Sequence, residues 1–341
     1  MQTSLSAREL YDWQEKPWLT YLALGCFFLS LAVLVLALAF WRAPDWRANL
    51  SPVASFHGHT LQYSVLPQQA WRARTPTRTW FHAPPSDSPQ STAYTGPPRW
   101  LRNATIPLAE PGPAASVKKI AIVLDDMGVN GPLSTVAIQK LPPSITLSFL
   151  SYGRATSHQA QLARMKGHEI MIHLPMEPES TADPGPNAIL ADMPADVVQK
   201  QTTIHLDALK NLAVGVNNHM GSKATQQLDI MHSVLNAVAR EKLFFLDSIT
   251  TSRPASRRLT QTYDIPILER DVFIDHYIDE GQVAHYLNKL EQVAAREGTA
   301  IGIGHPHPET VNALLKWLPT LEARGFKVVP ITQVMMAEAG R

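Results

Sequence analysis

Two adjacent aspartates, Asp125 and Asp126, follow directly on an apolar run from Ile120 to Leu124. Two carboxylates side by side can hold a cation while one of them accepts a proton as a base. Five apolar residues in a row predict a strand buried on both faces, as in a parallel sheet. Charges do not belong inside such a sheet, so we expect the aspartates at its carboxyl end, where ligands bind in barrels and open α/β sheets.

Polar residues also follow the other predicted strands. One histidine at the end of a strand is more often a hydrogen-bonded structural residue than a ligand, but six polar strand ends are hard to explain as solvated loops. If the strands are parallel, all of these groups converge on one rim. They are Asp125 and Asp126, His173 and Glu177, Asn217 to His219, Asp247, Arg270 to Asp275, and His305.

Aspartate and histidine without cysteine suit Zn²⁺ or another divalent first-row metal. Such a metal lowers the pKa of a water molecule toward about 7. A neighbouring carboxylate can then take the proton of this water, and a second acid can protonate the leaving group. The pattern therefore indicates a hydrolase.

Strands and helices alternate over the part of the chain that must position these residues. Apolar spacing typical of amphipathic helices occurs at 228–238, 283–293 and 311–321. Gly298 and Gly325 follow basic residues and predict helix ends. The alternation predicts a parallel α/β sheet or barrel. The predicted strands are 119–124, 145–149, 169–173, 213–217, 243–247, 267–270, 299–303 and 326–330.

The composition excludes several classes of protein. The formal net charge of +1 argues against a nucleic-acid binder, because there is no basic excess to neutralise phosphates. Cys26 is the single cysteine, so neither an intramolecular disulfide nor a cysteine-based zinc site can form. The length of 341 residues permits one large domain with appendages, or two domains.

Residues 19–41 carry no charge and are mostly Leu, Ala, Val and Phe. About 20 apolar residues span a bilayer as a helix. Trp18, Tyr21 and Trp41 lie where interfacial aromatic residues are expected. We therefore expect a transmembrane signal anchor at 19–41, after a short cytoplasmic N-terminus at 1–18.

Three other interpretations of this segment remain open: a buried core helix, a signal peptide cleaved near 37–39, and a lipid-modified Cys26. We prefer the uncleaved anchor because the apolar run is longer than the 7–15 residues usual for a signal peptide. Basic residues lie on both sides of the span, so the positive-inside rule does not decide its orientation. We expect the common arrangement, a single pass through the inner (cytoplasmic) membrane with the C-terminal domain on the periplasmic or extracytoplasmic side.

Residues 42–117 have the composition of a semi-extended linker. They contain 12 of the 27 prolines and show no persistent helical or alternating pattern. Five of the eight tryptophans lie between 41 and 100. These could pack on the globular domain, which we favour, rest on the membrane surface, or contact glycan. The globular domain is expected at 118–341.

The globular domain resembles the divergent polysaccharide deacetylases, distant relatives of the chitooligosaccharide deacetylase-type carbohydrate esterases. The resemblance covers about residues 118–335, and its motifs are specific together but not singly. It implies a deformed (β/α) barrel of about seven parallel strands, here preceded by a transmembrane helix and a Pro-rich linker. The matching segments are IVLDDMG (122–128), GHEIMIHLPMEP (167–178), GVNNHMGS (215–222), FFLDS (244–248), RDVFID (270–275) and AIGIGHP (300–306).

The resemblance implies roles for the first two motifs. Asp125 matches the catalytic base and Asp126 a metal ligand. His173 matches the first of two metal-binding histidines four residues apart, but Glu177 occupies the second position. Either His219, at the next strand end, or Glu177 itself would then complete the ligand set.

The resemblance also covers the later motifs. The usual arginine of the third motif is absent where Asn217, Asn218 and His219 stand. The family's late histidine, which protonates the leaving group, matches His305, and His307 is expected to face solvent. Supporting or substrate-binding roles are expected for Asn218, Asp247, Arg270 and Asp275, although Asp247 could instead cap a helix.

The implied function is a membrane-anchored, metal-dependent hydrolase that removes acetyl groups from an envelope polysaccharide or glycan. The expected cofactor is a divalent metal, with Zn²⁺ the first choice. The alternative is a catalytically silent module that binds glycan or envelope protein partners, which the altered motifs favour. A phosphoesterase is a weaker hypothesis, because the chain has no Gly-rich phosphate loop.

Overall fold

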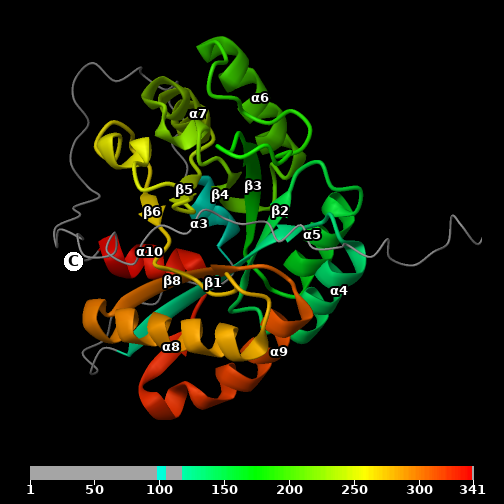
Figure 1. The fold of residues 1–341 in the computed structure, drawn as a ribbon, viewed down its shortest axis with the longest axis vertical. Coiled ribbons are helices and arrows are strands. Elements are labelled where there is room, and N and C mark those ends of the chain that lie inside the picture. Colours follow the sequence, from blue (N-terminus) through cyan, green and yellow to red (C-terminus); the bar gives the residue numbers. More distant parts are fainter. Residues whose placement is uncertain (1–97, 105–116, 340–341) are drawn as a thin grey trace, which may run out of the picture. The chain divides into compact units, whose positions relative to one another are not determined.

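A computed structural model of the protein describes residues 98–104 and 117–339. Strands and helices alternate along most of this part of the chain (Figure 1). The strands are β1 (Lys118–Met127), β2 (Thr146–Leu150), β3 (Ile170–Met176), β4 (Ala213–Met220), β5 (Phe244–Asp247), β6 (Ile267–Glu269), β7 (Val272–Phe273), β8 (Thr299–Gly304) and β9 (Phe326–Val328). The helices are α3 (Arg99–Asn103), α4 (Gly131–Lys140), α5 (Thr156–Met165), α6 (Ala195–Ala208), α7 (Leu228–Arg240), α8 (Glu280–Glu297), α9 (Pro308–Trp317) and α10 (Ile331–Ala339).

The strands form one sheet in the order β6-β5-β4-β3-β2-β1-β8-β7, and β9 also pairs with β1. Every pairing is parallel. The two end strands of this order, β6 and β7, are separated along the chain by Arg270 and Asp271 alone. One short segment therefore pairs first with β5 and then with β8, so the sheet curls round on itself. This fits the predicted (β/α) barrel.

Alternate residues of β1 enter two different apolar clusters, as expected for a strand buried on both faces. Ile120, Ile122 and Leu124 belong to the larger cluster, which includes residues from the surrounding helices. Ala121 and Val123 belong to the second cluster, whose residues come from the strands and from the segment leading through α10. The second cluster is therefore the interior of the barrel, and α10 covers it at the amino ends of the strands.

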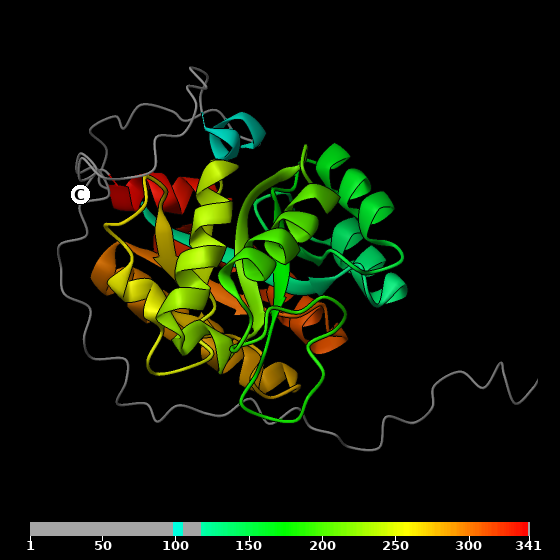
Figure 2. The ribbon, with the colours of Figure 1, turned by 90° about the horizontal axis from the view of Figure 1, so that it is seen from above.

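The two ends of the strands are covered differently (Figure 2). Helices α3 and α10 lie toward one side, and the long loop between β3 and α6 extends on the other. The first side holds the amino ends, because β9 pairs with the start of β1 and leads directly into α10.

Two glycines end elements as the sequence predicted. Gly298 and Gly325 have φ angles of 79° and 82°, in the left-handed region that favours glycine. The predicted helix at 311–321 is wrong in its second half. Helix α9 ends at Trp317 and a 3-10 turn follows at Leu318–Thr320, because Pro319 has no N–H to donate to the helix.

Helix α3 packs a short part of the Pro-rich region against the globular domain. Trp100 contacts the interior cluster. Arg99 Nη1 donates to Glu241 at 3.0 Å, and Asn103 Nδ2 donates to the carbonyl of Ala213, the first residue of β4, at 2.7 Å. The boundary expected at 118 therefore separates two segments that are in contact.

The predicted span at 19–41 and most of the linker lie outside the described residues. Within residues 98–104 and 117–339, no helix is long and apolar enough to cross a membrane.

Candidate metal and catalytic centre

A β-bulge places Asp125 and Asp126 in one site. The register of β1 against β2 shifts between Leu124 and Met127, and Asp126 has a φ of 57°. Adjacent side chains of a regular strand point to opposite faces, whereas a bulge and a left-handed residue change that direction. His173 Nε2 accordingly lies 3.5 Å from Asp125 Oδ2 and 3.4 Å from Asp126 Oδ1. Both carboxylates therefore reach the same imidazole.

Strand pairing brings His219 to the same place. His173 is the register partner of Asn217, and Pro175 is the partner of His219. Residues two apart in a strand share a face. The side chains of His173, Asn217 and His219 therefore project on the same side of two neighbouring strands.

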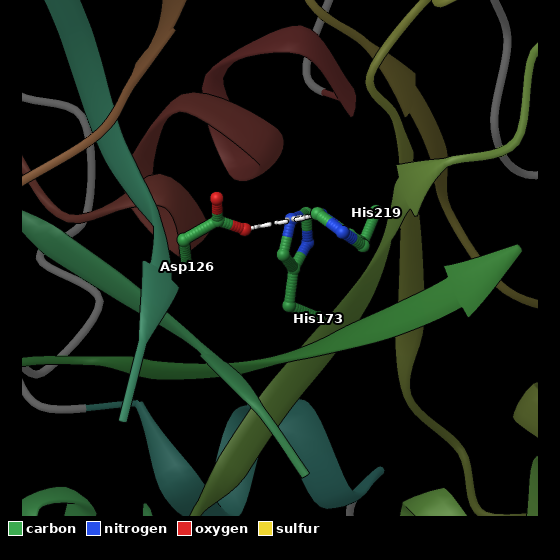
Figure 3. Close-up of side chains that lie close together, drawn as sticks. All are labelled: Asp126, His173 and His219. Atoms are coloured by element: carbon green, nitrogen blue, oxygen red, sulfur yellow. Dashed lines mark hydrogen bonds and ion pairs between the residues drawn. The ribbon is translucent and has the colours of Figure 1, made fainter. Parts of the chain in front are cut away.

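Three potential ligand atoms converge from Asp126, His173 and His219 (Figure 3). His219 Nδ1 lies 3.0 Å from Asp126 Oδ1 and 3.2 Å from His173 Nε2, and the third separation is 3.4 Å. A tetrahedral zinc ion with bonds of about 2.0 Å separates its ligand atoms by about 3.3 Å. The side chains as they stand therefore fit a divalent metal.

Glu177 does not join this group. Its carboxylate accepts from Lys223 Nζ at 2.5 Å and from the backbone N–H of Ala191 at 2.7 Å. These bonds hold the loop that follows β3. Of the two candidates for the missing histidine, the geometry brings only His219 to Asp126 and His173.

Asp125 is buried and held by a neighbouring amide. Asn217 Nδ2 donates to its two carboxylate oxygens at 2.9 and 3.0 Å. Burial raises the pKa of Asp125, an effect that the nearby His173 and His305 partly oppose. A buried carboxylate with a raised pKa suits a general base.

Asp126 has the opposite electrostatic balance. Burial alone would raise its pKa, but His219 and His173 outweigh this effect and hold the pKa well below its usual range. The pKa is thus raised for Asp125 and lowered for Asp126, which is the difference expected between a general base and a metal ligand.

His305 lies between two carboxylates. Its Nδ1 is 3.2 Å from Asp275 Oδ1, and its Nε2 is 3.7 Å from Asp126 Oδ2. Asp275 also accepts the backbone N–H of His305 at 2.5 Å and the Thr310 hydroxyl at 2.8 Å. Burial would lower the pKa of His305, but Asp275 and the other carboxylates raise it to about 10. A ring whose pKa is raised in this way suits a proton donor.

His307 is half-buried rather than facing solvent as expected. Burial lowers its pKa. Together with Asp275 and His305 it forms a second group of potential ligand atoms within 4.8 Å of one another. The three bonds that Asp275 accepts already use both of its oxygens, so this group fits a metal less well than the first.

Of the four residues expected to support catalysis, Asp275 contacts a predicted catalytic residue. The other three bond to the last residue of β4 or to the segment after β5. Asn218 Nδ2 donates to the carbonyl of Met220, Asp247 accepts from Ile249 N and Ser256 Oγ, and Arg270 donates to the carbonyls of Ser248 and Ile249.

Two residues near the centre, Asn217 and Tyr152, were not predicted to have a role in the site. Asn217 lies two residues before His219, so the two-residue period of a strand would have selected it over Asn218. Tyr152 follows β2, and burial, together with the negative charges of Asp126 and Asp183, raises its pKa to about 12. It is therefore a neutral phenol near the centre, and no sequence pattern marks it.

Fold and site together define a parallel α/β barrel protein with an Asp-His-His group at the carboxyl ends of its strands. The chain belongs to the divergent polysaccharide deacetylase family, whose model matches residues 122–335. The resemblance expected from the motifs is thus confirmed.

Relatives of this chain share the globular domain. The uncharacterized protein YibQ of Escherichia coli is 36% identical over 198 residues, which are 58% of this chain and 61% of YibQ. The chain therefore spans about three fifths of the length of that relative. An uncharacterized protein of Haemophilus influenzae is 30% identical over 60% of this chain and 72% of its own length. The crystal structure of an uncharacterized protein from Agrobacterium tumefaciens has a TM-score of 0.65 and 28% identity, covering 72% of this chain and 98% of that one.

Proposed function

We propose that the protein is a metal-dependent deacetylase that removes acetyl groups from a polysaccharide or glycan of the cell envelope. The observation that carries this proposal is the convergence of Asp126, His173 and His219 on one point. Asp125 and His305 lie next to this group, with the electrostatics expected of a base and an acid. The family to which the chain belongs supports the substrate class.

The donor set favours the metal. One carboxylate oxygen and two imidazole nitrogens without sulfur suit Zn²⁺ or another first-row divalent ion. Such an ion, held by Asp126, His173 and His219, would supply a Lewis acid that polarises the acetyl carbonyl. The two ring nitrogens face each other and the carboxylate at 3.0–3.4 Å, an arrangement that a cation between them would stabilise.

The protein's own residues would move the protons. Asp125 accepts a proton from the water that attacks the acetyl carbonyl. His305 donates its Nε2 proton to the departing amine or alkoxide as the bond to the acetyl carbon breaks. Asp275 fixes the orientation of this ring through Nδ1. The products are acetate and the free amine or hydroxyl of the sugar.

The apolar segment at 19–41 supports an anchor in the inner membrane. The domain would then lie on the periplasmic or extracytoplasmic side, where envelope glycan is found. The tryptophans of the linker are further candidates for contact with glycan, membrane or envelope proteins.

The test is metal content and acetate release by the purified full-length chain, assayed on N-acetylated and O-acetylated envelope glycans. Asp125→Asn should keep the metal and slow acetate release by about 10²- to 10⁴-fold. The matched control is Asp207→Asn, at an exposed aspartate of α6. A protein that binds no metal and releases no acetate from any glycan would refute the proposal and favour the binding module.

A further inference from the structure

Asn217 is a fully buried polar residue to which the mechanism above gives no role. Its side chain makes four short contacts, all with polar side chains. Nδ2 donates to both oxygens of Asp125 and to Ser248 Oγ at 3.2 Å, and Oδ1 accepts from Ser148 Oγ at 2.5 Å. The amide is therefore bonded at both ends.

The partners determine which end of the amide faces the base. An ionised carboxylate only accepts hydrogen bonds, so it must meet the NH₂ end of the asparagine. The Ser148 hydroxyl, which is also fully buried, donates to the oxygen end. An amide flipped by 180° would lose the hydrogen bond from Ser148 and would also place its oxygen against the carboxylate. Without the Ser148 hydroxyl, the first of these two energetic costs would disappear. Ser148 thus fixes the orientation of Asn217.

The pair reaches Asp125 across the barrel interior. Ser148 lies on β2 and Asn217 on β4, with β3 between them. Asn217 is also the register partner of His173, the ligand candidate that both aspartates approach. The two hydrogen bonds to Asp125 therefore tie the direction of its carboxylate to the same strands that carry the metal group.

We propose that Ser148 and Asn217 act as one positioning device that fixes the carboxylate of Asp125 in the direction needed to take a proton from water. This inference rests on the proposed function. Asn217 is a positioning residue, and Ser148 acts through it. The amide provides this positioning without adding a charge to the buried centre.

The experiment is a double-mutant cycle in the full-length chain, with kcat, KM and metal content measured for each variant. Asn217→Ala should lower kcat about 100-fold, since small misplacements of a catalytic group have effects of this size. KM and metal content should stay unchanged. Ser148→Ala should lower kcat less, and the double variant should be no slower than Asn217→Ala, because Ser148 acts only through Asn217. Asn288→Ala, at an exposed asparagine of α8, is the matched control.

Two kinetic results would overturn the inference while the proposed function stands: an unchanged kcat in Asn217→Ala, or single effects that multiply in the double variant. Ser148→Ala, which removes one oxygen, provides the test if Asn217→Ala does not fold. A crystal structure of either variant gives a readout that needs no activity. The Asp125 carboxylate should turn away from its wild-type direction, and an unmoved carboxylate would refute the positioning role. A wild-type protein that binds no metal and releases no acetate from any glycan would refute the proposed function instead, and the crystal structure would still decide on the positioning.

Discussion

The two ends of the same strands hold their buried polar residues in different ways. At the amino ends, Glu169 accepts from the backbone N–H and the hydroxyl of Thr332 at 3.2 and 2.5 Å. His168 Nδ1 bonds to the carbonyl of Ile145 at 2.8 Å. Each group there has a partner of its own. At the carboxyl ends, by contrast, several groups share one partner. The single atom His173 Nε2 lies within 3.5 Å of the carboxylates of Asp125 and Asp126 and of the imidazole of His219.

This difference indicates that the polar groups at the amino ends stabilise the fold, whereas those at the carboxyl ends form the candidate site. Groups with dedicated partners stabilise the fold, and removing one leaves the other unsatisfied. Groups that share partners in a buried cluster are typical of sites that bind and react. Mutations at the carboxyl ends should therefore remove metal binding or activity, whereas mutations at the amino ends should reduce stability alone.

The largest effect is expected for Asp126→Ala at the carboxyl end. Because this carboxylate contacts both His173 and His219, its loss should abolish metal binding and acetate release. The free energy of unfolding of the metal-free protein should also decrease, because the lowered pKa of Asp126 reports stabilising contacts with the two histidines and alanine is disfavoured at a φ of 57°. Metal analysis and urea denaturation check the two statements, and Glu177→Ala, which should keep the metal, is the control. Full metal occupancy in Asp126→Ala would remove this residue from the ligand set.

His305→Ala tests a residue of the carboxyl-end centre that is not a proposed metal ligand. If His305 is the proton donor that we propose, its loss should lower kcat by about 10²- to 10⁴-fold, while metal content stays the same. The loss should be smallest for substrates whose leaving group needs no proton, such as an acetylated phenol. An equal loss on both kinds of substrate would assign His305 another role.

Glu169→Ala tests the amino end. It leaves the N–H and hydroxyl of Thr332 without their acceptor, so the free energy of unfolding should fall by about 1.5–3 kcal/mol. The kcat and metal content of the folded variant should equal those of the wild type. Glu169→Gln keeps an acceptor and should lose less stability. A selective loss of activity in Glu169→Ala would break the proposed division between the two ends.

The smallest effect is expected when the free energy of unfolding is measured as a function of pH. Burial lowers the pKa of His168 and of His205, although hydrogen bonds to backbone carbonyls partly oppose it. Both pKa values thus lie below that of an unfolded histidine, about 6.5. The unfolded chain binds more protons as the pH falls below this value, so stability is complete above it and decreases below it. Urea denaturation of the metal-free protein between pH 7.5 and 5.5 measures the slope, which His205→Asn should reduce.

Much of the fold could be predicted from the sequence, because buried parallel strands are continuous apolar runs. The predicted strands at 119–124, 213–217 and 299–303 correspond to β1, β4 and β8. Strand β7 was not predicted, since two residues carry no periodicity. Its pairing with β8 is determined by the closure of the sheet rather than by its own sequence.

The site was predictable in its residue types but not in its pairings. Asp126, His173 and His219 were among the candidates because each follows an apolar run. The choice between Glu177 and His219 depends on the register of β3 against β4, which a single sequence does not contain. Once His219 belongs to the site, the two-residue period of the strand places Asn217, and not Asn218, on the same face, where it bonds to Asp125.

The bulge in β1 makes the centre sensitive to chain length as well as to residue type. An in-frame deletion of one codon between Leu124 and Met127 would restore a regular strand that still pairs with both neighbours. Such a deletion removes Asp125 or Asp126, so the centre would lose either its proposed base or a proposed metal ligand. A lineage could therefore lose the proposed centre in a single genetic event that leaves the apolar runs, and hence the family resemblance, intact.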